Sequence, residues 1–231
     1  MTRSSMLHFL CAAFFAAFAS GCGADRADDR ADSASSSDEN YDTVELRSPD
    51  EAPQLFWARA REGGQLFVMR HGKSPHGQIV AVGMTDGCIL GEGRGLSPDG
   101  RAEARSLGKK LAQEKVPILK AYTSDMCRSW DTARLVAGDA DVIAHPAQKT
   151  TSPEMISAFK DDVVAELEAN PGTTIALVSH SNVAPLYGAT VCDGEDELPE
   201  GIISVVTPDS WTTVARIWPD GMVSGCDRTV D

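Results

Sequence analysis

Residues 66–72 read LFVMRHG, in which four apolar side chains lead directly into arginine, histidine and glycine. A short apolar run of this kind predicts a buried β-strand that ends in a loop. The pattern returns at residues 174–180, which read TIALVSH and end on a second histidine. Two buried strands that each deliver a histidine to a loop indicate both the fold class and the place of the chemistry.

Strands and helices alternate through most of the chain. Apolar runs predict strands, and stripes at helical spacing predict helices, the first of them capped by Ser97. Strands are expected at residues 65–69, 118–123, 142–144 and 174–179, a final hairpin at 202–207 and 212–217, and helices from Ser97 to about residue 113, at 128–137 and at 155–169. This alternation predicts an α/β three-layer sandwich, with a mostly parallel central sheet and helices on both faces.

Residues 1–21 have the features of a secretory signal. Arg3 precedes an apolar stretch, residues 7–19, that is too short to span a bilayer comfortably. Small residues then lead to Cys22, which resembles a bacterial lipoprotein cleavage box, although Ala19 stands where leucine is usual. We expect acyl chains on Cys22 to anchor the protein at the periplasmic face of the cell envelope. The alternative is an ordinary signal peptide with Cys22 incidental, and a periplasmic or secreted protein.

Residues 22–52 are expected to form a disordered acidic tether, and residues 53–231 a folded domain. Residues 23–50 carry nine acidic side chains against three arginines and almost no large apolar group, so they cannot form a core. The whole chain has a formal net charge of −13. A nucleic-acid partner is therefore not expected, because phosphate backbones attract basic surfaces.

Four cysteines follow Cys22, namely Cys88, Cys127, Cys192 and Cys226. Export to an oxidising compartment would convert them into two disulfides. Three pairings are possible, of which we expect Cys88–Cys127 and Cys192–Cys226; four buried free thiols are the alternative. No close ligand spacing favours a metal site.

Three predicted strand ends carry polar groups that suit a phosphate. Arg70-His71-Gly72 follows the first strand, Arg128 opens the helix after the second, and His180 follows the third. Arginine binds phosphate oxygens in a bidentate manner, and glycine permits close backbone approach. A neutral histidine can attack phosphorus, and a second, as imidazolium, can stabilise the oxygens of the transferring group. If these strands are neighbours, the four side chains form a phosphate pocket.

Taken together, these motifs resemble those of the histidine phosphatase superfamily, which includes phosphoglycerate mutases and small phosphohistidine phosphatases. The resemblance covers roughly residues 64–218. It is carried by LFVMRHGKS at 66–74, LSPDGR at 96–101, YTSDMCRSWDTA at 122–133 and LVSH at 177–180. It implies a phosphoglycerate mutase-like fold with no cofactor and no metal.

The resemblance also implies roles for individual residues. His71 would be the phosphorylated nucleophile, and Arg70, Arg128 and His180 would hold the phosphoryl oxygens. Gly72, Ser74 and Ser181 would contact the substrate, with Arg94 at the pocket rim; Ser181 replaces the glycine that many relatives have there.

The general acid is expected to be a carboxylate beyond the second arginine motif. Glu154, which opens a helix after a loop, is the candidate for protonating the leaving oxygen. The alternative is a helix-start carboxylate that interacts with the helix dipole.

The sequence thus predicts a phosphatase, a phosphoric monoester hydrolase with a histidine nucleophile. It would act through a phosphohistidine on a small phosphorylated substrate of the envelope or periplasm. A phosphomutase, and a non-catalytic lipoprotein that binds phospholigands, are the alternatives.

Overall fold

The central sheet of the computed structural model has seven strands in the order β3-β2-β4-β1-β5-β6-β7. The structure describes residues 52–75 and 95–225, which lie within one compact unit, Tyr41–Asp231. Strands β1 (Leu66–Arg70), β2 (Ile118–Thr123), β3 (Asp141–Ala144) and β4 (Thr174–Ser179) are parallel to one another, whereas β5 (Ile203–Thr207), β6 (Thr212–Ile217) and β7 (Val223–Ser224) continue the sheet in antiparallel pairs.

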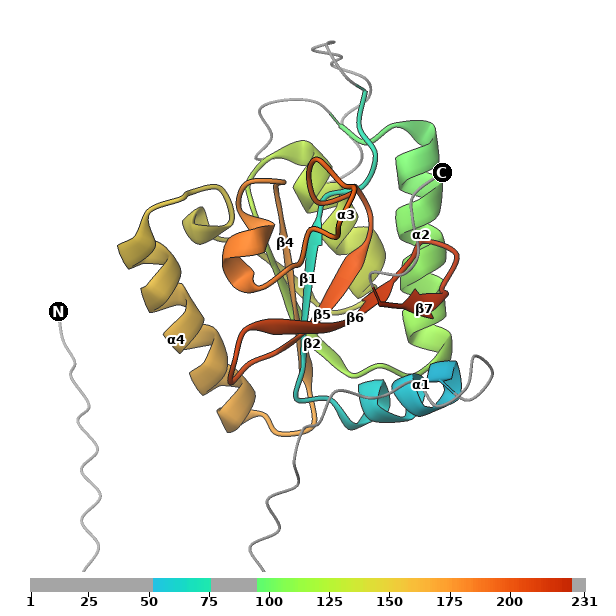
Figure 1. The fold of residues 1–231 in the computed structure, drawn as a ribbon, viewed down its shortest axis with the longest axis horizontal. Helices are drawn as coiled ribbons and strands as arrows, with labels where there is room; N and C mark the ends of the chain where they lie inside the picture. The colour runs from blue at the N-terminus through green and yellow to red at the C-terminus, as the bar shows by residue number, and fades with distance from the viewer. Residues whose placement is uncertain (1–51, 76–94, 226–231) are drawn as a thin grey trace, which may run out of the picture. The chain divides into compact units, whose positions relative to one another are not determined.

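Helices cover both faces of this sheet, as predicted. The four α-helices are α1 (Ala52–Glu62), α2 (Pro98–Gln113), α3 (Cys127–Ala137) and α4 (Pro153–Ala169), and two short 3₁₀ turns, η1 (Pro146–Gln148) and η2 (Ala184–Tyr187), lie in connections. Figure 1 shows α4 on one side of the strands and α1, α2 and α3 on the other. The expected α/β three-layer architecture is confirmed.

Two apolar cores match the two covered faces. Along β1, Phe67 and Met69 pack with the core that includes α2 and α3, whereas Leu66 and Val68 pack with the core that includes α4. Alternate side chains of a strand point to opposite faces, so a run that is apolar throughout is buried on both sides.

Helix α2 begins where its sequence predicts. The Ser97 hydroxyl accepts a hydrogen bond from the Gly100 amide at 3.0 Å and donates one to the Lys73 carbonyl at 3.1 Å. The first contact caps the helix, and the second ties its start to the loop that follows β1. The fold thereby fixes that loop, which carries several predicted site residues.

Helices α2 and α3 approach each other so closely that one position admits only glycine. A Cβ atom on Gly108 would lie 2.0 Å from the carbonyl oxygen of Leu135 in α3. The carbonyl oxygen belongs to the backbone of α3, so no side-chain rotation can relieve the contact.

Several predictions lie outside the described residues: the signal segment, Cys22 and the tether up to residue 51, together with Cys88, Arg94 and Cys226. Among the described residues, no helix combines the length and apolar character that a membrane span requires.

Candidate active site

The site is built where three neighbouring parallel strands end at one edge of the sheet. Arg70 at the end of β1 pairs with Ser179 at the end of β4, and Thr123 at the end of β2 pairs with Val178. Because β4 lies between β1 and β2, the residues that follow these ends must lie close together. They include both predicted histidines.

Arg128 joins the two histidines. Its Nε donates to His71 Nε2 at 2.8 Å, and its Nη2 lies 3.4 Å from His180 Nδ1. The two imidazole rings contact each other edge to face, with centroids 5.4 Å apart. The structure thus brings together His71, Arg128 and His180 from three separate parts of the chain.

The His71 ring is neutral, and the electron pair of its Nε2 faces Arg128. Its Nδ1 lies 2.8 Å from the Gly72 carbonyl, which can only accept, so Nδ1 carries the proton. Its Nε2 accepts from Arg128, so that nitrogen is unprotonated. Burial, together with the nearby charges of Arg128 and Arg70, lowers the pKa of His71 to about 3. This is the protonation state that a nucleophile requires.

His180 differs from the sequence-based expectation of an imidazolium. Burial first, and then the charges of Arg128 and Arg70, lower the pKa of His180 to about 4, so the ring is neutral near pH 7. With Nδ1 facing the Arg128 donor, Nε2 carries the proton and donates to the Ser124 hydroxyl at 3.0 Å. Sequence alone could not give this charge state, because it depends on how deeply the ring is buried beside two cations.

Arg70 is only 8% exposed and is surrounded by acceptors. Its Nη1 donates to the Leu198 carbonyl at 3.0 Å and lies 2.5 Å from Glu197 Oε1, and its Nη2 donates to Glu200 Oε1 at 3.3 Å. Its buried Nε has no hydrogen-bond partner within residues 52–75 and 95–225. A buried donor without an acceptor is costly, which makes Nε a natural contact for a bound anion.

Glu197 and Glu200 were not predicted at the site. Glu200 immediately precedes β5, and β5 runs antiparallel to β1. The start of β5 therefore lies at the edge where β1 ends, and Glu200 Oε1 comes within 3.7 Å of His71 Nδ1. The strand at 202–207 was visible in the sequence, but its pairing with β1, the signal that locates these carboxylates, was not.

The loop after β1 holds the remaining predicted contacts. The Gly72 amide donates to Thr132 Oγ1 at 2.9 Å, and that hydroxyl donates to the Arg128 carbonyl at 2.6 Å, so loop and arginine are linked. Ser74 is 5% exposed, and its hydroxyl has no hydrogen-bond partner in the part of the chain that the structure describes. Ser181 follows His180 directly and is half-buried.

Comparison with known proteins agrees with this geometry. Residues 66–151, which run from the start of β1 to the loop before α4, match the model of the histidine phosphatase superfamily (branch 1). This part of the chain is similar to the histidine phosphatase superfamily. No curated protein matches the chain.

Solved structures are similar to this chain in fold. The ecdysone phosphate phosphatase from Bombix mori in complex with tungstate is 13% identical, with a TM-score of 0.51, and the match covers 72% of this chain and 97% of that one. The protein histidine phosphatase SixA complexed with tungstate is 22% identical, with coverage of 67% and 97% and a TM-score of 0.47. Phosphoglycerate mutase from Bacillus anthracis str. Sterne is 16% identical, with coverage of 72% and 93% and a TM-score of 0.44.

Glu154 has a different environment from His71, Arg128 and His180. It lies in the first turn of α4, and its Oε2 accepts from the Ser152 hydroxyl at 2.8 Å rather than contacting His71, Arg128 or His180. Hydrogen bonds from its own backbone amide and from Ser152 lower the pKa of Glu154. A carboxyl group that stays ionised is a poor proton donor, so the geometry favours the alternative role at the helix start.

Cys127 and Cys192 are both disulfide-bonded. Cys127 immediately precedes Arg128, so its bond restrains the start of α3, where that arginine lies. The predicted partners Cys88 and Cys226 lie outside the described residues, and the pairing remains a prediction.

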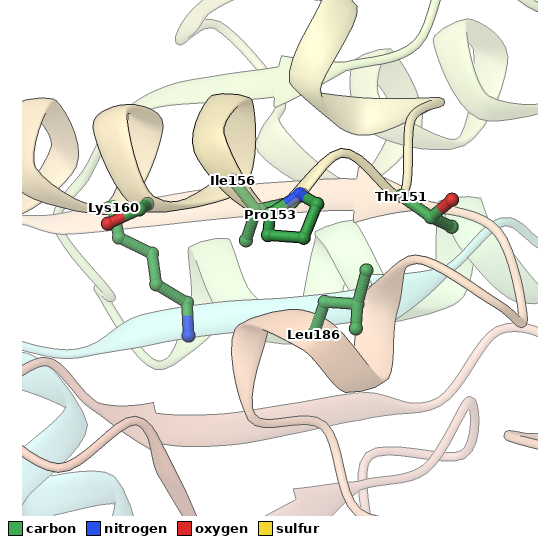
Figure 2. A pocket seen from close by; sticks show the side chains of 6 residues that line it. Thr151, Pro153, Ile156, Lys160 and Leu186 are labelled. Atoms are coloured by element: carbon green, nitrogen blue, oxygen red, sulfur yellow. The ribbon is translucent and has the colours of Figure 1, made fainter.

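An open hollow lies between α4 and η2. It is lined by Thr151, Pro153, Ile156, Ser157, Lys160 and Leu186. Figure 2 shows Leu186 of η2 opposite Pro153, with the Lys160 side chain extending from α4 along the same gap. The Lys160 ammonium lies 4.6 Å from the centre of the Trp211 ring, and burial lowers its pKa. The hollow is therefore mainly apolar, with one cation held on an aromatic face.

The two buried histidines should make the stability of this domain sensitive to acid. Their pKa values, about 3 and about 4, lie below the ordinary 6.5, so the unfolded chain binds more protons below pH 6.5. Stability contributed by the neutral rings is thus present above pH 6.5 and is lost as pH falls. Between about pH 7 and about pH 4, the free energy of unfolding measured in urea should fall less in His71→Gln than in the wild type. The difference between the two falls should be on the order of 3 kcal/mol. Equal losses in the two proteins would contradict this assignment.

Proposed function

We propose that the protein is a phosphatase that hydrolyses phosphomonoesters through a phosphohistidine on His71. The observation that carries the proposal is the Arg128 guanidinium, which contacts His71 Nε2 and His180 Nδ1 at once. A phosphoryl group placed between these three side chains would meet a nucleophilic nitrogen and a permanent cation together.

Two buried polar atoms support an anion at this place. Arg70 Nε and Ser74 Oγ lie on either side of the His71 segment, and neither has a hydrogen-bond partner among the described residues. Phosphoryl oxygens would supply the acceptors that these donors lack.

The reaction would proceed in two displacements. In the first, the Nε2 electron pair of His71 attacks phosphorus, the phosphorus–oxygen bond to the leaving alcohol breaks, and that oxygen takes a proton from water. In the second, a water molecule attacks the phosphohistidine, loses its proton to solvent, and releases inorganic phosphate with His71 restored. Arg128 and Arg70 would stabilise the charge that develops on the transferring oxygens, so positioning and electrostatics supply most of the catalysis.

Trapping the intermediate tests this proposal. Brief incubation with a labelled aryl phosphate, followed by a denaturing quench, should leave label on His71 that is stable in base and labile in acid. Peptide mapping by mass spectrometry would locate it. Reversible binding of the phosphate ester with neither label nor release of inorganic phosphate would support the non-catalytic alternative instead.

We further propose that the enzyme acts outside the cytoplasm, on a phosphorylated substrate of the envelope or periplasm. The apolar segment before Cys22 supports export, and the disulfides at Cys127 and Cys192 suit an oxidising compartment. Labelling with a fatty acid tests the anchor, since the label should disappear in Cys22→Ala and persist in the wild type.

A further inference from the structure

Glu197 and Glu200 place two negative charges on the same arginine that the proposed mechanism assigns to the phosphoryl group. Both lie in the segment Thr190–Glu200, here called the acidic loop, which precedes β5. Glu197 contacts Arg70 Nη1, and Glu200 contacts Arg70 Nη2 and lies beside His71. Neither carboxylate has a role in the two proposed displacements.

The acidic loop is held in place from inside the domain. Arg216 of β6 is 1% exposed, and its guanidinium donates to both carboxylate oxygens of Glu195 at 2.8 and 3.0 Å and also to the Thr190 carbonyl. The other face of the loop is fixed by the buried Leu198, whose carbonyl accepts from Arg70. A loop held by a buried ion pair presents its carboxylates in a defined position, not as a freely moving surface segment.

The charges around the phosphoryl position therefore nearly cancel before substrate binds. Arg70 and Arg128 contribute two positive charges, Glu197 and Glu200 contribute two negative ones, and the lowered pKa values of both histidines leave those rings neutral near pH 7. The nearby lysines add little, because Lys73 is paired with Glu103 at 2.7 Å and Lys149 with Asp125 at 2.5 Å. A phosphate dianion would leave this part of the described structure with an excess of negative charge.

The position of Glu197 indicates where a compensating positive charge on a substrate would lie. Its side chain is 53% exposed, whereas Arg70 and His71 beneath it are buried. With the phosphoryl group at the buried residues, as proposed above, the rest of a substrate would extend toward solvent, where Glu197 is the exposed carboxylate on Arg70.

We infer that the site selects phosphomonoesters whose leaving group carries a positive charge, such as the phosphates of amino alcohols. This inference rests on the proposed phosphatase function and specifies its substrate class. Hydrolysis of such an ester breaks the phosphorus–oxygen bond, adds the elements of water, and releases the amino alcohol and inorganic phosphate. The carboxylate at the rim attracts the ammonium and repels an anionic leaving group over the same distance.

Three small esters of similar size isolate the effect of charge. O-phosphoethanolamine has a cationic leaving group, propyl phosphate a neutral one, and phosphoglycolate an anionic one. At low ionic strength we expect kcat/KM to fall in that order, with about tenfold or more between the first and the last. In Glu197→Gln the ratio of the first to the last should fall by roughly threefold, chiefly through KM.

Asp209→Asn provides the matched control, because Asp209 is an exposed carboxylate beyond the far end of β5, at the opposite edge of the sheet. It should leave the ratio of the wild type unchanged. The inference is overturned if the wild type hydrolyses phosphoglycolate as fast as phosphoethanolamine, or if Glu197→Gln keeps the full preference. Hydrolysis of p-nitrophenyl phosphate tests the phosphatase proposal separately from the preference for cationic leaving groups. If the protein does not hydrolyse this ester, the phosphatase proposal itself is refuted.

Discussion

Replacing His71 with alanine should lower the hydrolysis of p-nitrophenyl phosphate by about 10⁴-fold or more. The substitution removes the Nε2 electron pair that Arg128 holds in place at 2.8 Å. The measurement is steady-state turnover per mole of folded protein, with folding checked by circular dichroism and urea unfolding.

His145→Gln is a suitable control for the loss of a histidine. His145 follows β3, and its ring stacks on Phe159 with centroids 4.3 Å apart and caps η1 through Nδ1. It should lose some stability and keep its turnover per folded molecule. Near-normal turnover in His71→Ala would show that another group is phosphorylated and would end the assignment of His71 as nucleophile.

Gly108→Ala should destabilise the domain by about 3 kcal/mol or more. A methyl group on Gly108 would lie 2.0 Å from the Leu135 carbonyl oxygen, so α2 and α3 would have to move apart. In an open helix the same change is favourable by up to about 1 kcal/mol, because alanine forms helices better than glycine. A loss of stability would therefore reflect the close packing of α2 and α3, whereas a gain would reflect the helix propensity of alanine.

Ser106→Ala, two residues earlier on the exposed face of α2, supplies the matched control. Urea unfolding at pH 7 should show little change or a small gain for this variant and a large loss for Gly108→Ala. Equal stabilities for the two variants would mean that the helices are not packed as closely as described.

The sequence predicted the two central parallel strands, β1 and β4, because they are buried on both faces and are therefore almost continuous apolar runs. The expected bounds at 174–179 and 118–123 agree with β4 and with β2, although β2 is only partly buried. Ser97 and Pro98 likewise marked the start of α2 through local chemistry alone. Helix α1 was missed, although Pro53 in its first turn and Arg59 and Arg61 in its last turn are helix-end signals.

The site was predictable only in part, for a physical reason. His71, Arg128 and His180 follow strands or open a helix, so neighbouring parallel strands were enough to place them together. Glu197 and Glu200 depend on the antiparallel pairing of β5 with β1, which no periodicity along the chain reveals. The neutral state of His180 depends on burial beside Arg128 and Arg70, which is likewise a property of the folded molecule.

Because β4 lies between β1 and β2, the site can assemble only late in the synthesis of the chain. The ribosome delivers β1 and β2 first, yet nothing joins these two strands in the sheet until β4 pairs with both, and His180 directly follows β4. A nascent chain therefore holds no assembled pocket until more than three-quarters of it has been made. If the chain enters an export channel before synthesis is complete, it stays inactive toward the phosphate esters of the compartment in which it is translated.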